Sequence, residues 1–146
     1  MNTYSFMSVA ATLVGPTGDV DLGYGASVAE EGISIEMAGD KNTMLIGSDG
    51  EGMHSLHADK SGSITIRLLK ISPANAKLQA FYDAQTLTPT LHGQNVIVVR
   101  NTQSGDVTTA RSCAFKKKPP LNYRKDGDIV EWVLDSLKID TILGTY

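Results

Sequence analysis

The feature that most constrains the fold of this chain is the strict alternation of apolar and polar residues in several short runs. Ile33 to Met37 and Ser63 to Leu68 both alternate, so every second side chain in each run lies on the same face of an extended strand. In the run Ile129 to Leu137, Val130, Trp132 and Leu134 share one face in the same way. These patterns predict strands that bury one face each, which is typical of an antiparallel sheet.

The segments between the runs are rich in Gly, Asp, Ser and Pro, which favour turns. Asp-Gly between two apolar runs is a strong hairpin signal, so Asp126 to Asp128 predicts a hairpin that joins strands at Leu121 to Lys125 and Ile129 to Leu137. Further strands are predicted at Ser5 to Val14, which the Gly15 to Gly18 turn ends, and at Asn95 to Asn101 and Val107 to Lys116, which Thr102 to Asp106 connects.

One helix interrupts the strands. Ser72 is a good N-cap and Pro73 suits the first helical position. A helical spacing then relates Ala74, Leu78, Phe81, Tyr82 and Gln85. The sequence therefore predicts a mainly β protein, an antiparallel β-sandwich or barrel with one packed α-helix, in a single domain over residues 1–146.

The composition excludes several classes of protein. With 41% apolar and 20% charged residues, the 146-residue chain is typical of a folded protein, and its net charge of −3 lacks the basic excess of a domain that grips nucleic acid. The longest strongly apolar run, Val96 to Val99, is too short to span a membrane, and Met1 to Met7 lacks a basic signal-peptide region. We therefore expect no membrane partner and synthesis in a cytoplasm. The single cysteine, Cys113, is expected to be a buried strand residue.

A possible metal site lies in the stretch Glu51 to Gly62, which holds two histidines and two carboxylates. His54 and His57 are three residues apart, and on a strand an odd spacing sends the two imidazoles to opposite faces. The third histidine, His92, lies far away in the sequence. We therefore favour a contact loop over a zinc-dependent enzyme. Since the sequence also lacks a nucleophile elbow and a Lys-bearing phosphate loop, it predicts no enzymatic activity and no cofactor.

Several phrases, in this order, resemble a family of bacteriophage structural proteins: Ala29 to Met37, Asp40 to Met44, Gly47 to His57, Ser61-Gly, Leu68 to Ala76, Ala114 to Lys117, Lys125 to Gly127, Glu131-Trp132 and Lys138 to Gly144. The family is the tail tube proteins of contractile-tailed phages. The resemblance implies a subunit of sixfold rings that stack into a tube, with inner sheets that join into a barrel around the lumen. It also implies contacts with further copies, the tail sheath, the baseplate and the tape-measure protein, and DNA that passes without specific binding. The location implied is the virion tail, after assembly in the host cytoplasm.

The same resemblance implies roles for two groups of residues. A long loop, Gly39 to Lys60, reaches neighbouring subunits and the adjacent ring. Its expected contact residues are Met44, Leu45, Ile46, Met53, His54, Leu56 and His57. The four residues expected to face the lumen are Ser34, Glu36, Thr65 and Arg67, with Glu36 as a possible partner of Arg67 across the strands. The basic run Lys116 to Lys118 is expected outside the lumen, on the sheath side or at a subunit seam.

Four alternatives remain open at the level of sequence, one of them a metal-dependent enzyme built on His54, His57 and a carboxylate. A small-ligand or carbohydrate-binding β-sandwich is another, although the nine Phe, Trp and Tyr residues are scattered along the chain. A baseplate-proximal tube subunit and a secretion-system tube relative share the expected fold and are not separable from a main tube subunit by sequence.

Overall fold

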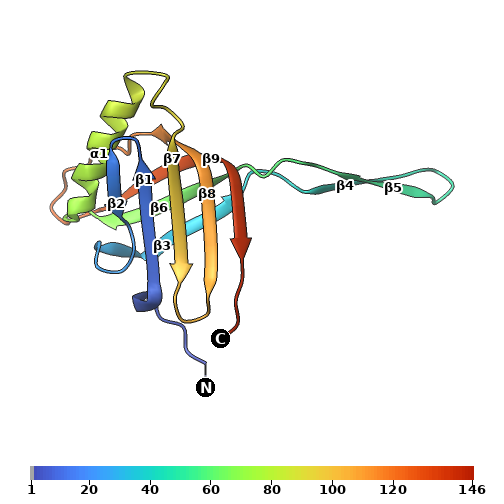
Figure 1. Cartoon of the computed structure of the whole chain (residues 1–146), viewed down its shortest axis with the longest axis horizontal. Coiled ribbons are helices and arrows are strands. Elements are labelled where there is room, and N and C mark those ends of the chain that lie inside the picture. The colour runs from blue at the N-terminus through green and yellow to red at the C-terminus, as the bar shows by residue number, and fades with distance from the viewer. Residues whose placement is uncertain (1) are drawn as a thin grey trace.

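A computed structural model describes residues 2–146 and shows one large antiparallel sheet, one helix and a projecting hairpin (Figure 1). The sheet has the strand order β2-β1-β7-β8-β9-β6-β3. Its strands are β1 (Val9–Gly15), β2 (Gly18–Asp21), β3 (Val28–Met37), β6 (Gly62–Leu69), β7 (Asn95–Asn101), β8 (Asp106–Lys117) and β9 (Ile129–Ile142). A 3-10 helix, Phe6–Ser8, precedes β1, and β4 (Asn42–Ile46) and β5 (Gly52–Leu56) pair only with each other.

The large sheet curls, so that its two halves enclose a common core. Figure 1 shows β3 and β6 crossing behind β1 and β7. The predicted alternation places Ile64, Ile66 and Leu68 of β6 fully inside this core, against Leu13 of β1 and Ile97 of β7. The predicted class, mainly antiparallel β with one packed helix, is confirmed, and the seven strands form one continuous sheet.

The helix α1 (Pro73–Thr86) packs at one end of the curled sheet, as predicted (Figure 1). The Ser72 hydroxyl caps it by accepting a hydrogen bond from the Ala74 amide. Leu78 and Phe81 are buried in the core. Among residues 2–146, no helix is long and apolar enough to cross a membrane.

The hairpin predicted around Asp126 to Asp128 is wrong. Residues 121–125 form no strand, and β9 pairs with β8 on one side and β6 on the other. Pro119 and Pro120 precede this segment, and proline has no amide to donate to a sheet. The segment instead crosses toward the turn between β6 and α1, where the Asn122 carbonyl accepts a hydrogen bond from Lys70.

A buried polar pair joins α1 to β7. Gln85 and Asn95 exchange hydrogen bonds of 2.8 and 2.6 Å, and Asn95 Nδ2 also donates to the Cys113 carbonyl at 3.1 Å. This explains why the helical pattern ends on a polar residue that is nonetheless buried.

Removing one member of this pair is expected to leave the other buried and unsatisfied. Asn95→Ala should lower the free energy of unfolding by about 1–3 kcal/mol, measured by urea denaturation. The matched control is Gln94→Ala at the exposed neighbouring position, which should change it by less than about 0.5 kcal/mol. Equal effects at the two positions would contradict the role of the buried pair.

Candidate functional site

The expected contact loop is a β-hairpin that projects far from the body of the protein (Figure 1). β4 and β5 pair in register from Asn42 opposite Leu56 to Ile46 opposite Gly52. The tip is closed by hydrogen bonds from the Gly47 amide to the Glu51 carbonyl and from the Gly50 amide to the Gly47 carbonyl. Gly50 has φ +89°, a conformation that favours glycine. The sequence does not predict these two strands, because both faces of the hairpin carry a mixture of apolar and polar side chains and show no alternation.

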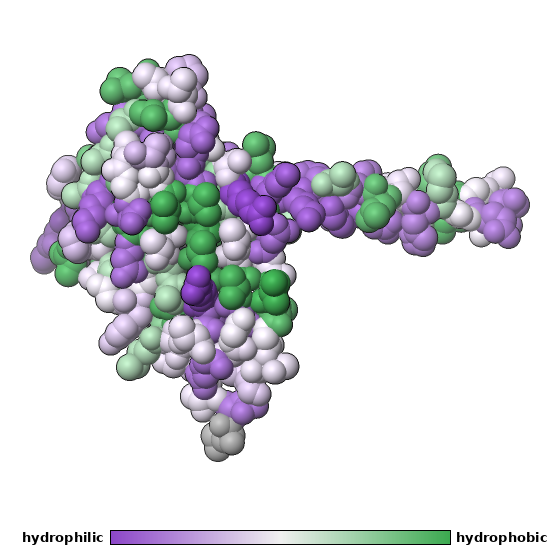
Figure 2. All heavy atoms as spheres, in the orientation of Figure 1, coloured by the Kyte–Doolittle hydropathy of each residue, from purple (hydrophilic) through white to green (hydrophobic). Residues whose placement is uncertain are grey.

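Large apolar side chains of the hairpin lie in solvent. Figure 2 shows them as separate hydrophobic patches along a mostly hydrophilic arm. They are Met44, Leu45, Ile46, Met53 and Leu56, each more than half exposed. A two-stranded hairpin has no core of its own and is only marginally stable in water. An arm of this composition is therefore suited to pack against another protein surface.

The two predicted histidines lie in different environments. His54 stands opposite Met44 in the hairpin, whereas His57 follows β5, where its Nε2 lies 2.7 Å from the Thr43 hydroxyl. No group of three or more His, Cys, Asp or Glu in residues 2–146 could hold a metal ion. Both histidines are exposed on the surface of the arm.

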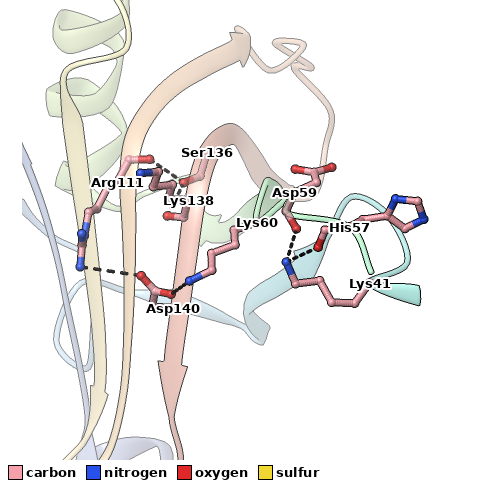
Figure 3. Close-up of polar contacts among 8 residues, drawn as sticks. All are labelled: Lys41, His57, Asp59, Lys60, Arg111, Ser136, Lys138 and Asp140. Atoms are coloured by element: carbon pink, nitrogen blue, oxygen red, sulfur yellow. Dashed lines mark hydrogen bonds and ion pairs between the residues drawn. The ribbon is translucent and has the colours of Figure 1, made fainter. Parts of the chain in front are cut away.

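Polar contacts fix the root of the arm (Figure 3). Lys41 Nζ donates to the carbonyl oxygens of His57, at 2.7 Å, and Asp59, at 3.1 Å. These bonds connect the segment before β4 to the segment after β5. Hydrogen bonds from Ser61 hold the pKa of the Asp59 carboxyl below its usual value, so this carboxylate stays ionised at neutral pH.

A second set of contacts attaches this root to the sheet. The Ile139 amide donates to the Lys60 carbonyl at 3.0 Å. Asp140 of β9 accepts from Lys60 Nζ at 3.3 Å and lies 3.7 Å from Arg111 Nη2 of β8 (Figure 3). These exposed ion pairs contribute little stability individually, and the Lys60–Asp140 pair links the root of the arm to β9.

The four residues expected in the lumen share one outward face of the sheet. Ser34 of β3 stands opposite Thr65 of β6, and Glu36 stands opposite Ser63. The same row continues to β9, where Ser63 stands opposite Asp135. This row is polar, because the carboxylates of Glu36 and Asp135 flank Ser63.

The predicted pairing of Arg67 with Glu36 is wrong. Arg67 Nε lies 3.4 Å from Glu131 Oε2 of β9, and Arg67 Nη1 donates to the Ser34 hydroxyl at 2.8 Å. Register explains the difference, because Arg67 is directly opposite Glu131, whereas Glu36 lies further along β3. The guanidinium therefore has a carboxylate partner on the same face.

The basic run lies at the end of β8. Lys116 and Lys117 are exposed strand residues, and Lys117 stands opposite Val133. Lys118 follows the strand and lines a groove beside α1. Val133 in turn stands opposite Thr65, so the register places Lys117 beside the face expected in the lumen, which conflicts with the prediction that the basic run lies outside it.

Cys113 is fully buried in β8, and burial raises the pKa of its thiol. The thiol therefore stays protonated at neutral pH and lacks the character of a nucleophile.

Sequence reasoning missed the residues that position the arm and neutralise Arg67. Lys41, Lys60 and Asp140 are separated by many residues, and only the docking of Lys60 beside β9 brings them together. Glu131 had a signal, because it precedes Trp132 in an alternating strand and must point outward when the tryptophan points inward.

Comparison with solved structures shows the same fold in tube components of contractile injection systems. A sheath/tube terminator of the PVC extracellular contractile injection system has a TM-score of 0.65 at 13% identity, covering 97% of this chain and 98% of that one. The tube-terminating cap of the anti-feeding prophage has a TM-score of 0.62 at 10% identity, covering 99% and 93%. A chain of the PVC sheath-tube complex has a TM-score of 0.56 at 13% identity, covering 91% and 88%.

No curated protein matches the chain by sequence. The family model described as bacteriophage PhiTE tail tube protein matches residues 1–144, nearly the whole chain. Proteins of this family are structural and not enzymes. The projecting arm and the polar outward face thus occur in a structural component, and the chain belongs to the family of PhiTE-type bacteriophage tail tube proteins.

Proposed function

We propose that this protein forms hexameric rings that stack into the tail tube, and that DNA passes through the lumen of this tube during ejection. The observation that carries the proposal is the projecting hairpin with exposed apolar side chains in a chain of the tail tube family. An isolated subunit gains nothing from such an arm, whereas a subunit beside others can bury it.

The arm supplies stacking contacts. Two pairs of apolar side chains are available to a neighbouring subunit. Leu45 lies directly opposite Met53, and Met44 lies diagonally opposite Leu56; all four side chains are exposed. Because the arm belongs to one surface and its receptor to another, the contact is head-to-tail and can repeat without limit. Open-ended repetition is what a tube requires.

The outward face of β3, β6 and β9 supplies the lumen wall. Its rows across β6 carry Glu36, Asp135 and Glu131, together with Arg67, which Glu131 already pairs; Lys117 of the adjoining β8 stands opposite Val133. A wall of this charge does not hold phosphates, so DNA slides past it. Joining this sheet to that of the next subunit also removes the exposed edges at β3 and β2.

The proposed location and partners follow from the tail tube family. Residues 1–146 act as one domain in the virion tail, assembled in the host cytoplasm. The sheath surrounds the tube, the baseplate nucleates it, and the tape-measure protein is a further partner. The structural similarity to sheath-tube and baseplate complexes of contractile systems supports the first two partners.

Concentration-dependent assembly tests the proposal. Purified protein at low and high concentration is examined by mass photometry and by negative-stain electron microscopy. We expect monomers to give way to sixfold rings and hollow tubes. Closed dimers or monomers under all conditions, including when pre-formed tail ends are added as nuclei, would contradict it.

Reversing the charge of the wall is expected to make the tube retain DNA. Glu36→Lys combined with Asp135→Lys places two cations in one row across β3 and β9, and repetition around a ring multiplies them. Labelled duplex DNA should then co-sediment with the tubes at low salt and dissociate as salt is raised.

The matched control for this pair is Glu36→Gln with Asp135→Asn, which removes the same carboxylates without adding cations. Control tubes should not retain DNA. Equal DNA binding by lysine-variant and control tubes, or binding on the outer surface in images, would contradict a lumen position for this face.

A further inference from the structure

An apolar groove lies between α1 and the 118–128 segment. Its volume is about 400 Å³, within the range of about 300–1,000 Å³ typical of sites that enclose a ligand. Trp132 and Val130 contribute from β9, Ala76 from α1, and Pro120 and Leu121 from the segment that replaces the predicted strand. The groove therefore offers apolar area to an inserted group.

The charged groups at the groove are predominantly basic. Lys70 and Lys118 line it, and Lys70 Nζ is held 4.1 Å from the centre of the Tyr123 ring. The one lining acid, Asp128, has Arg124 Nη1 3.8 Å from its carboxylate. Lys118 is thus left to attract an acidic partner, and Lys70, which donates to the Asn122 carbonyl, adds positive charge beside it.

The tip of the hairpin has the complementary character. Asp49 and Glu51 lie in the closing turn, both exposed, and residues 42–56 contain no lysine or arginine. Ile46 and Met53 lie next to the turn, more than half exposed. An acidic turn followed by apolar side chains matches a basic rim around an apolar groove.

The two surfaces lie at opposite ends of the molecule. In Figure 1, α1 and the segment after β8 lie at the left end, whereas the hairpin projects to the right along the longest axis. A chain cannot reach its own groove with this arm, so the contact must be made by another copy.

We infer that the groove between α1 and the 118–128 segment receives the hairpin tip of a second copy of this chain, in the next ring. The inference rests on the proposed function and adds the receptor for the arm. The hairpin tip inserts edge-on, so that Ile46 on one face and Met53 on the other each contact an apolar wall of the groove, and the tip carboxylates meet Lys70 and Lys118 at its rim.

Site-directed crosslinking tests this contact. Ser48→Cys at the tip and Ala76→Cys in the groove are made in separate chains, co-assembled, and oxidised. The native Cys113 is buried and does not compete. We expect a crosslinked dimer in which peptide mapping joins position 48 to position 76, because a disulfide needs Cα atoms within about 7 Å. The matched control replaces Ala76→Cys by Gln103→Cys, in the exposed turn between β7 and β8, and should give no crosslink.

Exchanging the charges provides an independent readout. Lys118→Glu should raise the protein concentration needed for tubes by about tenfold or more, since it places like charges together. Adding Asp49→Lys in the same chain should restore assembly. Tubes that form normally with no 48–76 crosslink and no effect of Lys118→Glu would overturn the inference and leave the proposed function standing. Failure of the unmodified chain to form rings or tubes would overturn the proposed function itself.

Discussion

Replacing Leu45 and Met53 with threonine is expected to abolish tube formation without changing the stability of the subunit. The two side chains face each other across the hairpin and are 66% and 57% exposed. Burial of a large aliphatic side chain contributes about 1.5–3 kcal/mol. Losing two such side chains from each arm should therefore weaken one ring-to-ring contact by roughly 100- to 10,000-fold. Threonine keeps the tendency to form a strand, so the hairpin itself remains.

The measurement compares the concentration at which tubes appear with the thermal unfolding of the monomer. The double variant should fail to form tubes at concentrations well above the threshold of the unmodified protein, with its Tm unchanged. The matched control, Leu45→Met with Met53→Leu, exchanges the two residue types and keeps the apolar area, so its tubes should form normally. Normal assembly of the threonine variant would show that this face of the arm contacts no other subunit.

Removing the Trp132 side chain is expected to have the largest effect on folding. Trp132 is 2% exposed and packs edge-to-face against Phe115, with ring centroids 5.8 Å apart. Phe115 packs in turn against Tyr82 of the helix at 6.0 Å. The indole Nε1 donates to Asn75 Oδ1 at 3.1 Å, so one side chain joins β9 to α1. Trp132→Ala should lower the free energy of unfolding by about 3–5 kcal/mol, a large part of the 5–15 kcal/mol of a typical domain.

Chemical denaturation followed by circular dichroism measures this loss. Trp132→Phe is the control, because it keeps an aromatic ring and removes the hydrogen bond to Asn75, and it should cost clearly less than the alanine variant. A loss below about 1 kcal/mol for Trp132→Ala would mean that the aromatic cluster does not connect the helix to the sheet.

Local patterns predicted most of the fold. The alternation at Ile64, Ile66 and Leu68 specified the buried face of β6, and the Ser72 cap with Pro73 specified the start of α1. Both signals act within a few residues, so they can be read without knowing what packs nearby. The hairpin predicted at Asp126 failed because the partners of β9 are distant in sequence, and pairing with β6 and β8 overrides a local turn signal.

The geometry of the candidate site could not be predicted from the sequence, and the roles of its residues stay predictions. Resemblance to tail tube proteins drew attention to Met44 and Met53, yet the paired strands of the arm were not expected, since their faces mix polar and apolar residues. The partner of Arg67 depends on the register between β6 and β9, which is set by the whole sheet. The groove beside α1 depends on where the 118–128 segment crosses the helix, for which the sequence has no local signal.

A helical reconstruction of assembled tubes by cryo-electron microscopy tests the central claim most directly, because it locates both the arm and the wall in one map. We predict six subunits in each ring, Glu36, Thr65 and Asp135 facing the channel, and the hairpin of each subunit extending into the adjacent ring. A tube in which the β3-β6-β9 face lies on the outer surface, or in which the hairpin contacts no other subunit, would contradict the account.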